Sequence, residues 1–425
     1  MRIALVSYHT SPLASLGSSS AGGMNVYVRR LAEGLAARDV EVDIFTRQEC
    51  ADCEREQEFT PGARVITVRA GPTRVITKDD LAAYAPCFAG NLARYISRRN
   101  LRYDAIHSHY WLSGLAAQAL RTERQPLVHM FHTLSRVKRH YQADAGKNDP
   151  PSRDYGEMSL LRSGQTLVFS TDAEVDDVER LYGFRPKSVA IIPPGVDGVV
   201  FGPEDREGAR RALGLGSEPL ILFVGRMDPA KGVDLLLQAI ARLRNRQDQP
   251  AARLLVVGGD DGNRDAMAHR ELERLKQIAN GLGIAERVQW EGVVPQRMLR
   301  LFYAASDLCA VPSRYESFGM VALEALSCGR PVVGFRSPGL EQTVRQDRTG
   351  ILVPSGDVES LAAALDRLVA DTQLARRMGL EASQSAKPFS WNRVADLTAD
   401  LYADLIGRGE ESLAPRTSRV MSGRR

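Results

Sequence analysis

The sequence of 425 residues contains no apolar run approaching the ~18–20 residues that a membrane-spanning helix needs. Its opening, MRIALVSYHT, places one positive charge before a short apolar run, which favours a β-strand over a signal peptide. The five cysteines include a single CxxC, Cys50 and Cys53, so we expect reduced thiols and not a disulfide scaffold. Together these absences favour a cytoplasmic protein without a stable membrane anchor.

An excess of charge is also missing. The net charge is only +4, from 56 basic and 52 acidic residues, which argues against a nucleic-acid-binding protein. Only seven of the 56 basic residues are lysines, so a lysine in a glycine-rich loop stands out. Apolar residues make up 44% and charged residues 25%, which is ordinary for a globular chain, and the length predicts two or three domains.

Several well-known motifs do not occur. The sequence has no GxGxxG, GxxxxGK[ST], HExxH, DxD or GxSxG. Their absence argues against a dinucleotide fingerprint, a P-loop, a zinc protease, a DxD metal-dependent transferase and a serine-hydrolase elbow. No spacing of His, Cys or Asp marks a metal site, so we expect that no cofactor is required; magnesium is compatible with the sequence but not indicated by it.

Apolar strands and amphipathic helices alternate along the chain. Continuous runs at Leu220–Val224 and at residues 254–257 predict strands buried on both faces of a parallel sheet. The alternation restarts after the proline- and glycine-rich stretch 193–204. We therefore predict an α/β fold of two doubly wound, Rossmann-like domains that face a central cleft, with ligands at the carboxyl ends of the strands.

The predicted domain boundaries follow from this restart. We expect a first Rossmann-like domain over residues 1–198 and a second over residues 199–388. A helix over residues 389–407 is expected to cross back onto the first domain. We expect residues 408–425, which have few apolar side chains, to form a disordered basic tail.

In the second half, GRMDPAKG directly follows the strand at Leu220–Val224. Its cations, Arg226 and Lys231, would lie at the carboxyl end of that strand, where they suit a diphosphate. A solvated turn with a surface pair is the alternative interpretation.

A second motif, ESFGMVALE, runs from a strand end into a helix. Glu316 and Glu324 are eight residues apart, so they could hold separate parts of one extended ligand by accepting hydrogen bonds from its hydroxyl groups. Ordinary helix capping by Glu316 is the alternative.

In the first half, Gly22 and Gly23 open a helix, which is typical of either a plain turn or an anion site. HSHYWLSG and HMFHTLSRVKRHY each follow a predicted strand. These segments predict a cleft ringed by His109, Tyr110, His132 and Thr133.

The combination of GRMDPAKG with ESFGMVALE resembles glycosyltransferase family 4, of the GT-B fold, over residues 1–405. Within that family, SYHTSPLA, GGMNVYV, IHSHYWLSG and HTLSRVK are most similar to the D-inositol-3-phosphate glycosyltransferases of mycothiol biosynthesis. The resemblance implies a retaining transfer of a sugar from a UDP-sugar to a phosphorylated polyol. The expected sugar is N-acetylglucosamine, and the expected acceptor is 1D-myo-inositol 3-phosphate. The expected partners are these two substrates, and a homodimer is left open.

The resemblance also implies roles for individual residues. The implied donor-site residues are Gly23, Arg226 and Lys231 at the diphosphate, Val294 at uracil, Glu324 at the ribose, and Glu316, Ser317, Phe318 and Gly319 at the sugar. The implied acceptor-site residues are His9, Asn25, Lys78, Tyr110, Thr133 and Arg153. His132 would lie at the reacting centre, where Arg226, Lys231 and Glu316 complete the catalytic set.

Two departures from the subgroup keep other functions open. MDPAKG is closer to sucrose-phosphate synthases, and Pro338 stands where a glycine is more usual. One alternative is therefore transfer of glucose to fructose 6-phosphate. The basic stretches 94–102 and 136–141 would also suit a peripheral membrane glycosyltransferase acting on a phosphoinositide lipid. A sugar-nucleotide 2-epimerase and a non-enzymatic nucleotide-sugar sensor complete the alternatives.

Overall fold

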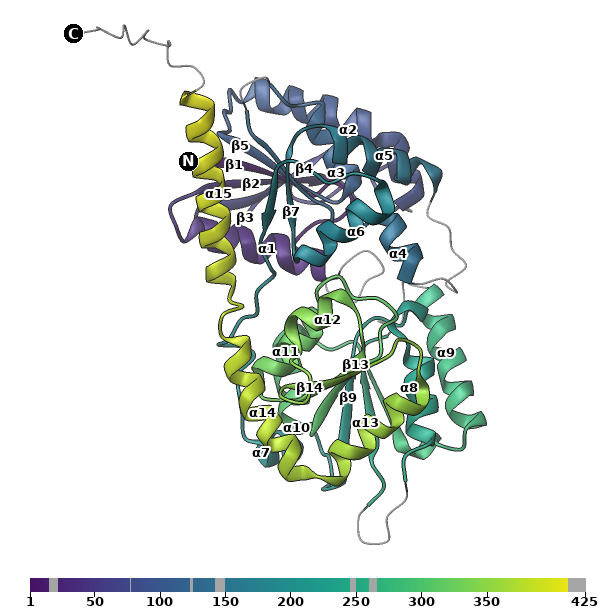
Figure 1. Ribbon diagram of the computed structural model, residues 1–425. Coiled ribbons are helices and arrows are strands. Elements are labelled where there is room, and N and C mark those ends of the chain that lie inside the picture. The colour runs from purple at the N-terminus through teal and green to yellow at the C-terminus, as the bar shows by residue number, and fades with distance from the viewer. Residues whose placement is uncertain are drawn as a thin grey trace, which may run out of the picture.

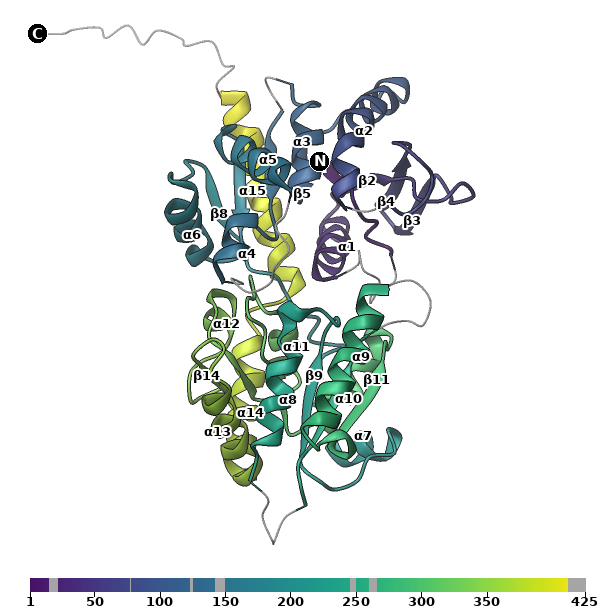
Figure 2. The same cartoon turned by 90° about the vertical axis from the view of Figure 1, so that its right-hand side faces the viewer.

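The computed structural model describes residues 1–14, 22–76, 78–122, 125–141, 150–244, 250–259 and 266–411. These residues form two α/β domains, one above the other in Figures 1 and 2, each built on its own sheet. The predicted GT-B-like arrangement of two Rossmann-like domains is confirmed.

The first domain is built on an eight-stranded sheet of order β3-β4-β2-β1-β5-β6-β7-β8. Its strands are β1 (Arg2–Val6), β2 (Glu41–Arg47), β3 (Glu56–Thr60), β4 (Ala63–Val68), β5 (Ala105–His109), β6 (Leu127–Met130), β7 (Thr166–Phe169) and β8 (Val189–Ile191). Its helices are α1 (Gly23–Ala36), α2 (Lys78–Arg98), α3 (Trp111–Gln118), α4 (Ser135–Tyr141), α5 (Pro151–Arg162) and α6 (Asp172–Tyr182).

The second domain is built on a six-stranded parallel sheet of order β11-β10-β9-β12-β13-β14. Its strands are β9 (Leu220–Val224), β10 (Arg253–Val257), β11 (Val288–Gly292), β12 (Leu308–Val311), β13 (Val332–Phe335) and β14 (Gly350–Val353). Its helices are α7 (Arg206–Ala212), α8 (Val233–Ala241), α9 (Ala266–Gly281), α10 (Gln296–Ala305), α11 (Met320–Ser327), α12 (Pro338–Thr343), α13 (Val358–Ala370) and α14 (Thr372–Ala386), with 3-10 turns η1 (Pro229–Lys231) and η2 (Ala285–Arg287).

Both faces of each sheet are covered, as the continuous apolar strands predict. In β9, Ile221 packs into one buried cluster and Leu222 into another on the opposite face. In β1, Leu5 packs with Leu31 of α1, whereas Val6 packs with Phe88 of α2 on the other side. This double burial fixes the strand ends, and with them the loops that form the cleft.

The sequence prediction missed the β3–β4 hairpin at one edge of the first sheet. β3 is antiparallel to β4, so this sheet is not purely parallel. β3 reads EQEFT and has no buried residue, so it carries no apolar signal of its own. An edge strand pairs on one side only and needs little apolar surface.

The prediction of five reduced thiols is wrong for two cysteines. Cys50 and Cys53 form a disulfide in the loop after β2, with Cα atoms 5.4 Å apart. Cys87 is exposed as a thiol, and Cys309 and Cys328 are buried thiols. The CxxC spacing brings the sulfurs of Cys50 and Cys53 together within one short stretch of chain.

A long final helix, α15 (Trp391–Glu411), lies along the first domain beside α1, as the yellow ribbon shows in Figures 1 and 2. The two chain connections between the domains run side by side, because the Val196 N–H donates to the Phe389 carbonyl at 2.8 Å. The helix extends to Glu411, so the predicted boundary at 407 falls short. Residues 412–425, most of the predicted tail, lie outside the described residues.

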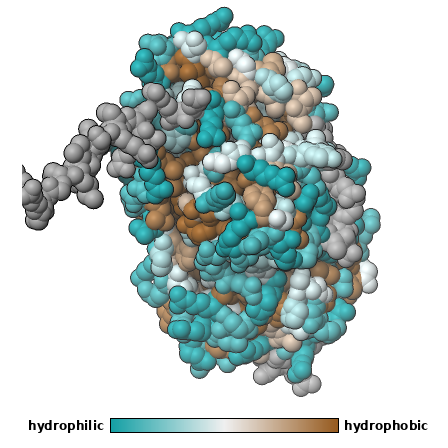
Figure 3. Space-filling view, turned by 45° about the horizontal axis from the view of Figure 1, so that its top comes forward, coloured by the Kyte–Doolittle hydropathy of each residue, from teal (hydrophilic) through white to brown (hydrophobic). Residues whose placement is uncertain are grey.

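No helix in the described part of the chain is long and apolar enough to cross a membrane. Figure 3 shows a face on which hydrophilic residues predominate and hydrophobic ones lie mostly in the upper half of the view. The large exposed apolar side chains lie in loops and in helices of both domains, among them Val75, Tyr155, Val199 and Leu380.

Two glycines inside helices should respond oppositely to alanine, because only one of them, Gly34, lies at the contact between α1 and α15. A Cβ on Gly34 would lie 2.7 Å from the Ala395 Cβ, so Gly34→Ala must displace α15 and should cost about 1–3 kcal/mol. Gly90 of α2 has nothing within 4 Å of its Cβ position, so Gly90→Ala should gain up to about 1 kcal/mol. Thermal unfolding of both variants checks this; a Gly34→Ala protein as stable as Gly90→Ala would contradict the described packing.

Candidate functional site

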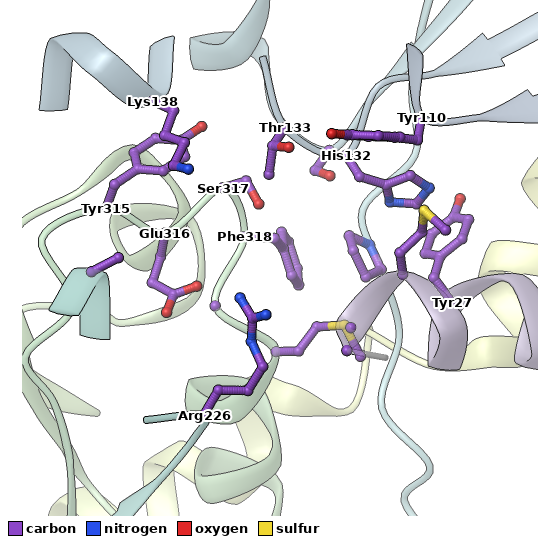
Figure 4. A pocket seen from close by; sticks show the side chains of 18 of the residues that line it. Tyr27, Tyr110, His132, Thr133, Lys138, Arg226, Tyr315, Glu316, Ser317 and Phe318 are labelled. Atoms are coloured by element: carbon purple, nitrogen blue, oxygen red, sulfur yellow. The ribbon is translucent and has the colours of Figure 1, made fainter. Parts of the chain in front are cut away.

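A cavity of ≈ 520 Å³ lies between the two domains. Figure 4 shows Thr133, His132 and Tyr110 above this space and Arg226, Glu316 and Phe318 below it. The sequence-predicted residues that line the cavity are His9, Gly23, Asn25, Tyr110, His132, Thr133, Arg153, Arg226, Lys231, Glu316, Ser317, Phe318 and Gly319. Motifs from both halves of the chain therefore meet in one place.

Four predicted residues, Glu324, Val294, Lys78 and His109, are not among those that line the cavity; His109, at the end of β5, is fully buried. Glu324 lies within α11 at 9% exposure and accepts a hydrogen bond of 2.8 Å from the Tyr303 hydroxyl. Burial raises the pKa of Glu324 to about 7. Val294 is half-buried against the second domain's core. Lys78 begins α2, but its side chain lies outside the described residues.

The loop after β9 is held in a tight turn. Asp228 accepts from the Ala230 N–H at 2.9 Å and so caps the 3-10 turn η1, which contains Lys231. Gly232 has φ +68°, and a Cβ there would lie 2.1 Å from the Pro312 carbonyl oxygen. Only glycine fits this close approach, so the last residue of GRMDPAKG fixes the loop against the neighbouring strand end.

Lys231 and Glu316 form an ion pair across this junction. The Lys231 Nζ lies 2.5 Å from Oε1 of Glu316, which also accepts from the Ser313 hydroxyl at 2.7 Å. Both side chains are partly exposed to the cavity, at 25% and 14%. Arg226 is more open, at 44%, and lies 3.4 Å from Asp228. An anionic ligand would meet two cations here, one of them already oriented by a carboxylate.

Two helices begin at the cavity, one from each domain. α1 starts at Gly23 and α11 follows Gly319, and a Cβ on Gly23 would lie 3.2 Å from the Met320 sulfur. Gly319 has φ +82°, which glycine adopts readily. Backbone N–H groups at such helix starts favour negative charge, which adds to the effect of Arg226.

Asn25 holds the start of α1 in place. Its side-chain oxygen accepts from the Gly22 N–H at 3.0 Å, and its Nδ2 donates to the Thr10 hydroxyl at 2.8 Å and the Ser11 carbonyl at 2.7 Å. These bonds give Asn25 a structural task in addition to its place on the cavity wall.

Arg153 and Thr133 come together in the first domain. The Arg153 guanidinium donates to the Thr133 carbonyl at 3.0 Å and hydroxyl at 3.2 Å, and its carbon lies 5.2 Å from the centre of the Tyr110 ring. Arg153 itself is only 4% exposed. A planar guanidinium beside two hydroxyl-bearing side chains suits a phosphate group.

The sequence analysis missed the carboxylate that orients Arg153. Glu157, fully buried on α5, accepts from the Arg153 Nε at 2.7 Å, the Ser135 hydroxyl at 2.7 Å and the Tyr182 hydroxyl at 2.5 Å. The i,i+4 spacing of Arg153 and Glu157 was the available signal, but such pairs are common on exposed helix faces. Lys138, one of the few lysines, also lines the cavity and was not among the predicted site residues.

His132, on the cavity wall, adjoins a group of buried histidines. Its Nε2 lies 3.1 Å from the His109 Nδ1, and the centre of the His109 ring lies 4.3 Å from that of the tilted His107 ring. Burial lowers the pKa of His132 to about 3 and that of His109 well below its ordinary value. Both rings are therefore neutral near pH 7. Within the described ranges, no group of three His, Cys, Asp or Glu side chains is placed to hold a metal ion.

Two family models match the two domains separately. "Glycosyl transferase 4-like domain" matches residues 22–195, and "Glycosyl transferases group 1" matches residues 205–385. The chain is also 41% identical over 405 residues to the D-inositol 3-phosphate glycosyltransferase of Nocardia farcinica, covering 95% of this chain and 89% of that one. The chain belongs to the same glycosyltransferase family as this Nocardia enzyme. The Corynebacterium jeikeium enzyme of the same name is 40% identical, with 96% and 98% covered.

Solved structures share the fold of this chain. The sucrose-phosphate synthase from Thermosynechococcus elongatus superposes with a TM-score of 0.88 at 33% identity, covering 96% of this glycosyltransferase and 99% of that chain. Anabaena HepE in complex with UDP and glucose has a TM-score of 0.71 at 19% identity, with 95% and 100% covered, and shows the shared fold.

The raised pKa of Glu324 predicts a pH-dependent stability. Between pH 4.5 and 7 the folded protein keeps a proton on Glu324 that the unfolded chain has lost, so stability falls as pH rises through about 7. Glu324→Gln removes this contribution, which is at most about 3 kcal/mol. Comparing Tm at pH 5 and pH 8 tests this, and the wild type should lose more than the variant. Equal losses would mean that Glu324 is ionised in the folded protein at pH 5.

Proposed function

We propose that this glycosyltransferase moves a sugar, with N-acetylglucosamine as first candidate, from a UDP-sugar to 1D-myo-inositol 3-phosphate, with retention at the anomeric carbon. One observation carries the proposal: a single cavity is lined by Arg226 and Lys231 from one domain and by Arg153 and Thr133 from the other. Two separate cationic positions suit a diphosphate donor and a phosphorylated acceptor. The reaction is proposed to take place in the cytoplasm and to require no metal.

Residues of the second domain support the proposed binding of the donor. Arg226, Lys231 and the helix start at Gly319 would meet the diphosphate, and Glu316 with the amides of Ser317 and Phe318 would hold sugar hydroxyls. Glu324 and Val294, set back from the cavity, remain the proposed ribose and uracil contacts. The UDP bound in the Anabaena structure agrees with a UDP-sugar donor.

Residues of the first domain support the proposed binding of the acceptor. Arg153, oriented by Glu157, would bind the acceptor phosphate together with Thr133, Tyr110 and Lys78. His9 and Asn25 line the same wall. The name shared by the Nocardia and Corynebacterium relatives supports an inositol phosphate acceptor.

In the proposed mechanism, the acceptor hydroxyl oxygen attacks the anomeric carbon from the face that the UDP leaves. The bond from that carbon to the diphosphate oxygen breaks, the new glycosidic bond forms, and the departing diphosphate takes the hydroxyl proton. Arg226 and Lys231 would neutralise the growing charge on the diphosphate. The other side chains would align the two substrates, which alone can supply a large share of the rate.

The first experiment measures UDP release from UDP-N-acetylglucosamine and UDP-glucose, each with inositol 3-phosphate, inositol, fructose 6-phosphate or no acceptor. We expect release only with UDP-N-acetylglucosamine and inositol 3-phosphate. Equal release with unphosphorylated inositol would overturn the phosphate role of Arg153.

A sucrose-phosphate-synthase-like reaction is the second candidate, favoured by the 0.88 TM-score to the Thermosynechococcus enzyme. It predicts release with UDP-glucose and fructose 6-phosphate in the same screen. Release that needs phosphoinositide vesicles would favour a membrane acceptor, and sugar epimerisation without any acceptor would favour an epimerase.

Lys231→Ala should lower kcat by ~10²–10³, by analogy with the loss of one donor to a transition-state anion. Lys276→Ala is the matched control, because Lys276 forms a surface ion pair with Glu273 in the same domain and does not line the cavity. Steady-state kinetics of both variants, with Tm as a check on folding, decide the point. Turnover in Lys231→Ala close to that of the control would remove Lys231 from the mechanism.

Arg153→Ala should raise the acceptor KM at least about tenfold and leave the donor KM within about twofold, because a charge-assisted phosphate contact is worth roughly 1.5–3 kcal/mol. Arg162→Ala, on the same helix but off the cavity wall, serves as the control. A raised donor KM with an unchanged acceptor KM would show that Arg153 acts on the donor and not on the acceptor.

A further inference from the structure

The hydrogen bond between His109 and His132 connects the cavity wall to a buried ring. His132 lines the cavity in the turn between β6 and α4, whereas His109, the last residue of β5, is fully buried. The His109 Nδ1 and His132 Nε2 are 3.1 Å apart. Neither ring carries a positive charge near neutral pH, because burial lowers both pKa values. One ring must therefore donate an N–H, and the other must accept it with a lone pair.

The other nitrogen of His109 decides the direction of this bond. The His109 Nε2 is buried and has no hydrogen-bond partner among the residues that the structure describes. If His132 donated, His109 would carry its proton on Nε2, as a buried N–H without an acceptor. Buried N–H groups are rarely left unpaired in proteins, whereas unpaired lone pairs are better tolerated. The favoured arrangement places the proton on the His109 Nδ1, from which it is donated to the His132 Nε2.

We propose that His109 is a positioning residue, which fixes His132 as the Nδ1–H tautomer and so presents an N–H donor to the bound sugar or diphosphate. The proposal rests on the proposed function and on the expectation from the family resemblance that His132, which lines the cavity, lies at the reacting centre. In this state His132 donates a hydrogen bond through Nδ1 and cannot take up a proton at Nε2. The acceptor's proton is then left to the departing diphosphate.

His132 also has a constrained backbone that fits such a role. Its φ is +59°, a conformation that few residues other than glycine adopt. The Tyr27 ring packs edge-on against the His132 ring at 5.2 Å between centroids. The bond to His109 therefore acts on a ring whose position is already restricted by its backbone and by α1.

The direct test is nitrogen NMR of the free protein labelled with ¹⁵N-histidine. Substitutions at each of the two histidines assign their signals. We expect both His109 and His132 as Nδ1–H tautomers, which is the less common form of a free imidazole. Nε2–H on both rings, or rapid averaging between the two forms, would overturn the proposal. Because no substrate is needed, this result stands apart from the success or failure of the proposed reaction.

Kinetics of two substitutions provide the second readout. The Asn Nδ2 can replace the Nδ1–H donor, so His109→Asn should keep kcat within about threefold. His109→Leu removes the donor and should lower kcat about tenfold or more, with both KM values within about twofold. His107→Leu is the control, because His107 is buried beside His109 but bonds to the Tyr402 hydroxyl at 2.7 Å. Equal kcat losses in all three variants would reduce His109 to a packing role.

Discussion

The ion pair between Lys231 and Glu316 joins the two loops on which the second domain's half of the site depends. At 2.5 Å it ties the turn after β9 to the start of α11, with residues 85 positions apart in the sequence. Gly232 allows the turn after β9 to approach the Pro312 carbonyl oxygen at the end of β12, which brings the two loops together. Since Lys231 lines the open cavity, a bound diphosphate would compete with Glu316 for the same ammonium group. Donor binding would thereby free Glu316 to accept hydrogen bonds from the sugar.

The first domain uses the same physical device with a different carboxylate. Glu157 is buried and receives several donors, so the Arg153 guanidinium is held in one orientation before any ligand arrives. His109 would do the equivalent for His132 through a neutral bond. In each case a side chain on the cavity wall is oriented by one behind it. Such preorganisation lowers the cost of reorganising the site during the reaction.

Much of this arrangement was predictable from the sequence because the strands are buried on both faces. Runs such as Leu220–Val224 need no context to be recognised, and the motifs that follow them must lie at the sheet edges. β3 escaped prediction because an exposed edge strand has no apolar signature. The bonds of Lys231 with Glu316 and of His109 with His132 join different strand ends, so they depend on the strand order, which no local pattern contains. The partners of Glu157 likewise come from distant positions, Ser135 at the start of α4 and Tyr182 at the end of α6.

We propose that one cavity binds a nucleotide diphosphate on the second domain's side and an acceptor phosphate on the first domain's side. A crystal structure with UDP and inositol 3-phosphate bound together tests it most directly. We expect the diphosphate within hydrogen-bond distance of Arg226 and Lys231, and the acceptor phosphate against Arg153 and Thr133. An inositol phosphate bound away from Arg153, or a diphosphate bound on the first domain's side, would contradict it.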